Sequence, residues 1–367
     1  MEIVPRATDM GGMEITDIME RFGDAQTMAL AGLAVGAAFG VAAQASAFCM
    51  RAATVEVGRG ESGSRLGVWL LAAAVAVLAT QVLALGGHLD LDSSRYLDQG
   101  GSLSGALLGG ALFGAGMILS RGCSGRLLIL SATGNLRAVF AVAVFALTAW
   151  LAYDGALVPV REAITGLWRG QVGAAEATGL LGLGAYGGVG IGAVLLAVAL
   201  LTAVRTRIGW VAGIAALAVG GAIALGWWAT SAIAALSFDP MDVESVTFSR
   251  PFVFLVEGIA GNEPLVSFGT AMLGGVLAGS FVSALMRREI RVQKFESLRD
   301  VPRYALGAVM MGVGAVAAGG CATGALTGTT TFAVAPLLAL VGIAAGAMVT
   351  DRLIDRAPAM GMVPAAG

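Results

Sequence analysis

The chain has 367 residues, of which 57% are hydrophobic and only 13% are charged. A soluble domain carries about a quarter charged residues, so this chain has too few charges to cover the surface of a water-soluble globule. The apolar excess excludes disorder, and a net charge of −2 without a basic patch argues against nucleic-acid binding. The charges gather between long apolar stretches, which is typical of a protein that crosses a membrane many times as helices.

Nine apolar stretches run along the chain, and a helix that spans the membrane needs about 20 apolar residues. They are residues 27–50, 66–87, 101–120, 127–152, 179–204, 208–236, 265–286, 304–318 and 333–350. The preceding residues 1–26 lack the apolar core of a secretory signal, and we expect either an unstructured tail or a short interfacial helix there. The predicted fold class is an all-α polytopic membrane protein.

The distribution of arginine orients the chain, because cytoplasmic loops carry an excess of Arg and Lys. Positive side chains are frequent in 51–65, 205–207 and 287–303 and near the C-terminus, whereas 88–100 and 237–264 are acidic. We therefore expect a multi-pass protein of the cell inner (plasma) membrane with its N-terminus outside and its C-terminus in the cytoplasm.

Two short, glycine-rich stretches, 101–120 and 304–318, are each followed by a Gly-Cys turn and further apolar sequence. Such a pattern predicts re-entrant half-helix hairpins whose central turns lie at membrane depth and line a cavity. With Cys123 aligned to Cys321, the shared residues are Leu108, Gly109, Gly114, Gly116, Gly122 and Cys123 against Leu306, Gly307, Gly312, Gly314, Gly320 and Cys321. Because the predicted orientation places the two units on opposite faces, we expect inverted pseudo-symmetric repeats.

These patterns divide the chain into five parts. They are a tail or interfacial helix (1–26), a first membrane repeat with Cys49 and Cys123 (27–152), a connecting region with additional spans (153–264), a second membrane repeat with Cys321 (265–350) and a C-terminal tail (351–367). A Gly-x-x-x-Gly pattern recurs in both repeats, at Gly36 and Gly40 and at Gly275 and Gly279, but the second copy has no counterpart of Cys49.

The Gly-Cys turns are candidate anion sites, because glycine permits a tight turn and helix ends direct N–H groups toward a ligand. A thiol is a weak donor that is polarizable and poorly hydrated, so a thiol at each constriction suggests a ligand with a soft sulfur atom. Several weak contacts also release an ion more readily than one strong clamp. The predicted pathway residues are Cys49, Cys123, Cys321, Gly122, Ser124, Gly125, Gly320 and Thr323.

Other interpretations of these residues stay open. Cysteine in a membrane helix is often a small packing residue, although matched positions in a repeat weaken that interpretation. Arg121 and Arg126 either attract an anion or bind helix-end carbonyls and reach an interface. Three distant cysteines and the single histidine, His88, fit neither a disulfide framework nor a metal site, and we expect no cofactor.

At these residues the chain resembles the YeeE/YedE family of membrane proteins. The resemblance covers roughly 27–350 and is carried by Phe48-Cys49, by Gly114-Ala115-Gly116 with Arg121-Gly122-Cys123-Ser124-Gly125, and by Gly312-Val313-Gly314 with Gly320-Cys321-Ala322-Thr323-Gly324. It implies an all-helical fold with buried central loops and import of thiosulfate for sulfur assimilation. It also implies an hourglass path along which Cys49, Cys123 and Cys321 pass the anion through S–H···S hydrogen bonds, and a soluble sulfur-carrier partner of the YeeD/TusA type.

The predicted function is therefore uptake of thiosulfate, or a related sulfur-bearing anion, by a transporter that is not an enzyme. From the topology we expect the anion to meet Cys123, then Cys321, then Cys49. A membrane sulfurtransferase or thiol oxidoreductase that uses a cysteine persulfide is the alternative, but the chain has no Cys-x-x-Cys pair. Two further alternatives are a carrier of another anion, in which the cysteines only pack, and a structural subunit. The structural subunit has little support, because polar turns at membrane depth are energetically costly unless they form a site.

Overall fold

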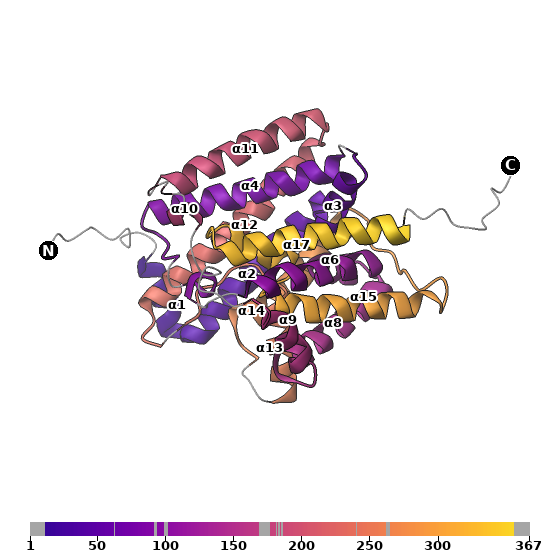
Figure 1. Ribbon diagram of the computed structural model, residues 1–367. Helices are drawn as coiled ribbons and strands as arrows, with labels where there is room; N and C mark the ends of the chain where they lie inside the picture. The colour runs from indigo at the N-terminus through magenta and orange to yellow at the C-terminus, as the bar shows by residue number, and fades with distance from the viewer. Residues whose placement is uncertain are drawn as a thin grey trace.

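The computed structural model describes residues 12–61, 63–91, 94–98, 102–168, 177–180, 182, 184, 186–239, 241–261 and 265–355. In these residues the regular structure is helical apart from two isolated bridges (Figure 1). The α-helices are α1 (Gly12–Phe22), α2 (Asp24–Ser46), α3 (Met50–Gly58), α4 (Ser64–Leu85), α5 (Arg95–Asp98), α6 (Gly110–Leu119), α7 (Ser124–Ala132), α8 (Leu136–Asp154), α9 (Val158–Thr165), α10 (Ala177–Leu180), α11 (Gly187–Arg205), α12 (Trp210–Leu236), α13 (Ser249–Ala260), α14 (Phe268–Met286), α15 (Asp300–Ala317), α16 (Ala322–Thr329) and α17 (Val334–Thr350). Two π-helical turns, Gly105–Gly109 and Asp351–Asp355, precede α6 and follow α17.

Nine helical segments of the described chain are long and apolar enough to cross a membrane, which confirms the predicted polytopic α class. They are Asp24–Gly58, Ser64–Leu85, Gly105–Ala132, Leu136–Asp154, Gly187–Arg205, Trp210–Leu236, Phe268–Met286, Asp300–Thr329 and Val334–Ile354. In Figure 1, α11 and α4 lie together on one side of the bundle, and α17, α6 and α15 lie below them. The large hydrophobic side chains that α11 exposes, such as Leu201 and Val204, suit contact with lipid.

The boundaries around the two Gly-Cys turns differ from the predicted ones. A short helix follows each cysteine, but α7 is separate from α8 within the predicted stretch 127–152, and α16 lies between the predicted stretches 304–318 and 333–350. A turn at Gly134 separates α7 from α8, and its φ of 94° favours glycine. Asn135 follows, and its side chain accepts a hydrogen bond from the Ala138 amide and caps α8. Each unit is thus a helix, a break that ends at cysteine, and a second short helix.

Glycines let α6 and α15 cross at close range. A Cβ atom added to Gly116 would lie 2.4 Å from the carbonyl oxygen of Gly307, and one added to Gly307 would lie 2.7 Å from that of Gly116. Gly109 and Gly314 approach each other in the same way. A Cβ atom added to Gly109 would lie 2.9 Å from the Gly314 carbonyl oxygen, and one added to Gly314 would lie 2.6 Å from that of Gly109. In the sequence alignment Gly109 matches Gly307 and Gly116 matches Gly314, so each of these contacts is repeated by its aligned partner.

The crossing of α2 and α14 has the same reciprocal character. A Cβ atom on Gly36 would lie 2.2 Å from the Met272 carbonyl oxygen, and one on Gly275 would lie 2.2 Å from the Leu33 carbonyl oxygen. The Gly-x-x-x-Gly pattern in both repeats therefore belongs to one tight helix pair. Three of the four helices in these crossings, α2, α6 and α15, each end a few residues before a cysteine.

The N-terminal part of the described chain is helical rather than extended. Helix α1 packs on α2 and buries Met19, while residues 1–11 lie outside the described part.

Candidate substrate pathway

Each of the three cysteines is the N-cap residue of a short helix. Cys49 precedes α3, Cys123 precedes α7 and Cys321 precedes α16, and all three have extended backbone conformations. N-cap positions favour Ser, Thr, Asp and Asn, whose oxygens bind the free amides of the first turn. A thiol is a weaker acceptor, so these helix ends keep N–H groups and positive dipole ends directed at the sulfur atoms.

Cys321 is fully buried, and its sulfur accepts two backbone hydrogen bonds. The amides of Phe248 and Gly324 donate to its Sγ atom, each at 3.4 Å. The Gly324 contact closes the first turn of α16, and the Phe248 contact ties the loop before α13 to the same sulfur. The second Gly-Cys turn is therefore joined to a segment 73 residues away in sequence.

Cys49 and Cys123 lie beside each other, and their thiols interact as side-chain hydrogen-bond partners. The backbone amide of Ala52 interacts with the Cys49 sulfur, and that of Arg126 interacts with the Cys123 sulfur. Neither forms a capping hydrogen bond like that at Cys321. Cys321 lies within electrostatic range of Cys123. The structure thus pairs two free thiols that are widely separated in sequence, Cys49 and Cys123, while Cys321 stands at the second turn.

The other predicted pathway residues surround these thiols. Gly122 and Ser124 are buried on either side of Cys123, and Thr323 is buried in the first turn of α16. Gly125 is required for packing, because a Cβ atom there would lie 2.6 Å from the ring of Phe248.

Phe48, together with two phenylalanines that the sequence analysis did not single out, Phe39 and Phe248, forms a chain of ring contacts near the thiols. The rings of Phe48 and Phe39 lie 6.2 Å apart, and those of Phe39 and Phe248 lie 5.7 Å apart. Phe248 connects the two Gly-Cys turns, since its amide binds Cys321 and its ring covers Gly125. Residues 248–254 gave no motif in the sequence, and only the tertiary contact reveals the place of Phe248.

The two arginines of the first turn have different surroundings. Arg126 donates to Oε1 of Gln44 at 3.2 Å, and Nε2 of Gln44 donates to Oε2 of Glu289 at 2.8 Å. Arg126 also interacts electrostatically with both Cys49 and Cys123. Arg121, in contrast, is exposed and has a φ of 59°. Of the two, Arg126 is the one that lies beside the thiols.

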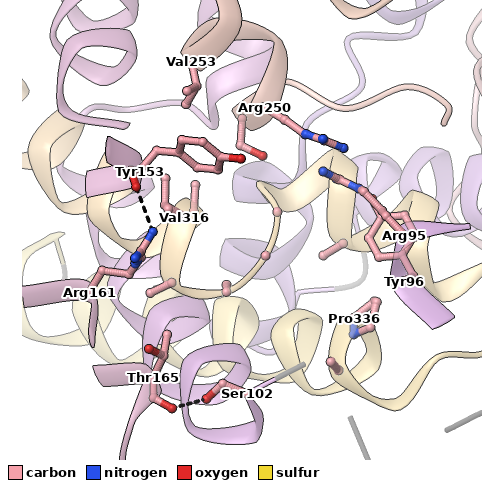
Figure 2. Close-up of a pocket in the computed structure, with 18 residues that line it drawn as sticks. Arg95, Tyr96, Ser102, Tyr153, Arg161, Thr165, Arg250, Val253, Val316 and Pro336 are labelled. Atoms are coloured by element: carbon pink, nitrogen blue, oxygen red, sulfur yellow. Dashed lines mark hydrogen bonds between the residues drawn. The ribbon is translucent and has the colours of Figure 1, made fainter. Parts of the chain in front are cut away.

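A cavity of about 320 Å³ adjoins the second turn, and Gly319 and Gly320 form part of its wall. Arg95, Arg161 and Arg250 also line it, and Figure 2 shows Arg95 and Arg250 together on one side with Arg161 across from them. Sequence reasoning missed these arginines because they lie far apart in the chain, in loops and short helices.

Hydrogen bonds fix each of the three cavity arginines. Arg161 donates to the Tyr153 carbonyl oxygen at 2.9 Å, and Arg250 pairs with Asp242 at 3.0 Å. Arg95 donates to the hydroxyl of Tyr96 at 3.0 Å, and that hydroxyl donates to the Gly324 carbonyl oxygen at 3.0 Å. The cavity is therefore tied to the same turn of α16 that holds Cys321, and its positive charges suit an anion.

Comparisons with known proteins assign the chain to a family. The family described as Sulphur transport matches residues 45–349, a range that contains all three thiols. The chain is 24% identical over 330 residues to the thiosulfate transporter TsuA of Spirochaeta thermophila, covering 84% of this chain and 94% of that protein. It is also 38% identical over 66 residues, 18% of each chain, to the thiosulfate transporter TsuA of Escherichia coli strain K12. The chain therefore belongs to the sulphur transport family, and it is a membrane transporter rather than an enzyme.

Proposed function

We propose that this protein takes up thiosulfate across the inner membrane along a path formed by its three thiols. The observation that carries the proposal is the position of all three thiols at helix N-termini, with Cys49 against Cys123 and the turn of Cys321 beside an arginine-lined cavity. The two relatives named as thiosulfate transporters support this choice among sulfur-bearing anions.

The cavity gives the path a direction. Gly319 and Gly320 line the cavity and directly precede Cys321, whereas Cys49 neither lines the cavity nor adjoins a residue that does, and its thiol contacts Cys123. We therefore revise the expected order of contacts to Cys321, Cys123 and Cys49. Arg95 and Arg250 belong to the acidic regions that the charge distribution places outside, and 287–303 belongs to the cytoplasmic side. The reciprocal glycine contacts support the inverted repeat that follows from this orientation.

Weak contacts suit passage of a dianion. A protonated thiol donates to the terminal sulfur of thiosulfate, whereas a thiolate would lose that donor and repel the anion. The helix N-termini and Arg126 offset part of the charge in a region of low dielectric constant. Because no single contact is strong, the anion moves from one thiol to the next without being trapped.

At the inner end, Cys49 is only half-buried and is the last thiol on the path. A soluble sulfur-carrier protein of the YeeD/TusA type would receive the anion there, close to the loop that follows α14.

Growth tests this proposal. A bacterium that cannot take up thiosulfate is given this chain or an empty vector, with thiosulfate as its sole sulfur source. We expect growth only with the chain, and we expect excess sulfate to compete weakly because it lacks a soft sulfur atom. Failure to grow, with the protein present in the membrane at normal levels, would contradict thiosulfate uptake.

A further inference from the structure

Two buried hydroxyl groups beside the thiols have no hydrogen-bond partner among the described residues. They belong to Ser124 and Thr247, each of which is 1% exposed. A buried hydroxyl without a partner is costly, and native proteins rarely keep one without a reason. These two orphans therefore mark places where a polar group can be received.

The Thr247 hydroxyl faces the first turn of α16. A Cβ atom added to Gly324 would lie 2.5 Å from Thr247 Oγ1 and 3.7 Å from Cys321 Sγ, so hydroxyl and thiol approach the same backbone position. The amide of Gly324 donates to that thiol. Thr247 Oγ1 thus stands beside Cys321 at the N-terminus of a helix, where an anion is favoured.

At the other turn the unpaired hydroxyl comes from the turn itself, from Ser124. It is the first residue of α7 and directly follows Cys123. Phe248 lies between the two hydroxyls, because it follows Thr247 in the chain and its ring covers Gly125, the residue after Ser124. Each Gly-Cys turn therefore combines a thiol, a helix N-terminus and an unpaired hydroxyl.

Four other hydroxyls of α16 and of the turn after it do have partners. Thr327 donates to the Val246 carbonyl oxygen at 2.7 Å. Thr329, Thr330 and Thr331 each donate to a carbonyl oxygen within their own turn. Local bonding of this kind is the usual fate of threonine in a helix, which makes the orphaned Thr247 a distinct feature.

We propose that Thr247 and Ser124 bind the oxygen atoms of the transported anion while Cys321 and Cys123 contact its sulfur. This inference rests on the proposed function and extends it to the basis of substrate choice. Thiosulfate carries one soft sulfur and three oxygens on a central sulfur atom, so a site with both kinds of donor recognises both ends. Sulfide lacks the oxygens and sulfate lacks the soft atom, and each would leave donors unpaired.

Transport kinetics in proteoliposomes test the proposal with four variants. Thr247→Val and Ser124→Ala remove the hydroxyls, Thr247→Ser keeps one, and Thr80→Val is the matched control. Thr80 also has a buried hydroxyl without a partner among the described residues, but its neighbour Gln81 binds the Thr330 carbonyl, at the end of α16 away from Cys321. We expect KM for thiosulfate to rise about tenfold or more in Thr247→Val and Ser124→Ala, and to stay near the wild-type value in Thr247→Ser and Thr80→Val.

Thermal unfolding of the purified protein provides a second measurement. Removal of an orphaned hydroxyl should leave Thr247→Val as stable as the wild type without thiosulfate, and should reduce the stabilisation that added thiosulfate confers. Wild-type KM values in both Thr247→Val and Ser124→Ala would overturn the inference, as would a lower melting temperature without thiosulfate and an unchanged response to it. A wild-type protein that takes up no thiosulfate would instead overturn the proposed function.

Discussion

Cysteine is an uncommon choice for a helix N-cap, and this chain uses it three times. Serine at these positions would satisfy the first-turn amides better and would also bind an oxyanion more firmly. The chain forgoes that stability at Cys321, where sulfur accepts two long hydrogen bonds of 3.4 Å. At the scale of single residues, stability and transport therefore make opposite demands.

Replacement of Cys321 by serine separates these demands. The shorter, stronger oxygen acceptor should hold the Gly324 amide and stabilise α16 by up to about 1 kcal/mol. Thiosulfate uptake should fall at least about tenfold, because the soft contact is lost. Parallel measurements of thermal unfolding and uptake check both effects, and a serine variant with wild-type uptake would argue against a specific role for sulfur.

Arg126 should contribute charge to the path rather than stability alone. Arg126→Gln keeps a hydrogen-bonding side chain near Gln44 but removes the positive charge beside Cys49 and Cys123, so we expect uptake to fall about tenfold or more. Arg126→Lys should retain part of the activity. The control is Arg121→Gln, which changes an exposed arginine of the same turn. Equal uptake by Arg126→Gln and Arg121→Gln would show that the charge is not used.

The buried carboxyl of Glu244 leads us to expect that anion binding beside Arg95 and Arg250 depends on pH. Burial raises the pKa of this carboxyl above its usual value, and Arg95 and Arg250 oppose that rise in part. As pH falls through the raised pKa, the carboxylate becomes neutral and the cavity arginines attract an anion more strongly. We expect KM for thiosulfate to fall with pH in this range, and Glu244→Gln to have a low KM that no longer changes there. An unchanged pH profile in Glu244→Gln would exclude this carboxyl as the cause.

At the scale of helices, close glycine crossings position the broken segments. The crossing of α6 and α15 brings backbone against backbone at Gly116 and Gly307, and each of these helices ends a few residues before a cysteine. Any side chain inserted there would push the two Gly-Cys turns apart. The helix pair and the thiol cluster are therefore parts of one packing arrangement.

Gly116→Ala tests this arrangement. Its Cβ atom would lie 2.4 Å from the Gly307 carbonyl oxygen, so we expect a loss of about 1–3 kcal/mol in the free energy of unfolding together with reduced uptake. Gly221→Ala is the control, because a Cβ atom there meets no described atom within 4 Å. Unfolding in detergent compares the two variants. Equal stability would mean that the crossing tolerates a side chain.

Helix formation was largely predictable from sequence, whereas several boundaries and contacts were not. Runs of about twenty apolar residues identify spans because lipid allows few other structures. The division of the predicted stretch 127–152 into α7 and α8 was missed, because the separating turn depends on the conformation of Gly134 and on the Asn135 cap. Cys49 and Phe248 have no local motif that places them beside Cys123 and Cys321; only tertiary packing does so.

At the scale of the whole molecule, the arginine-lined cavity and the Arg-rich loop after α14 belong to different ends of the path. The loop touches the turn before α8, where the Leu136 amide donates to the Gln293 carbonyl oxygen at 2.9 Å. It also reaches Gln44 through Glu289, on the Cys49 side of the cluster. The proposed orientation places this end in the cytoplasm and the cavity outside.

Labelling with a membrane-impermeant maleimide tests that orientation. Phe238→Cys and Glu296→Cys introduce thiols at exposed positions of the two opposite regions. We expect the first to react in intact cells and the second only in inverted vesicles, with the unmodified chain as the background control. The reverse pattern would invert the proposed direction of the path.

Uptake of radiolabelled thiosulfate by proteoliposomes is the most direct measurement of the central claim, with Cys123 as the decisive residue because it adjoins Cys49 and lies near Cys321. Cys123→Ala removes one small polar atom from a buried position and should insert normally. The account predicts that uptake falls to background in Cys123→Ala and in Cys321→Ala while the unmodified chain remains active. Wild-type uptake rates in both alanine variants would contradict the thiol path.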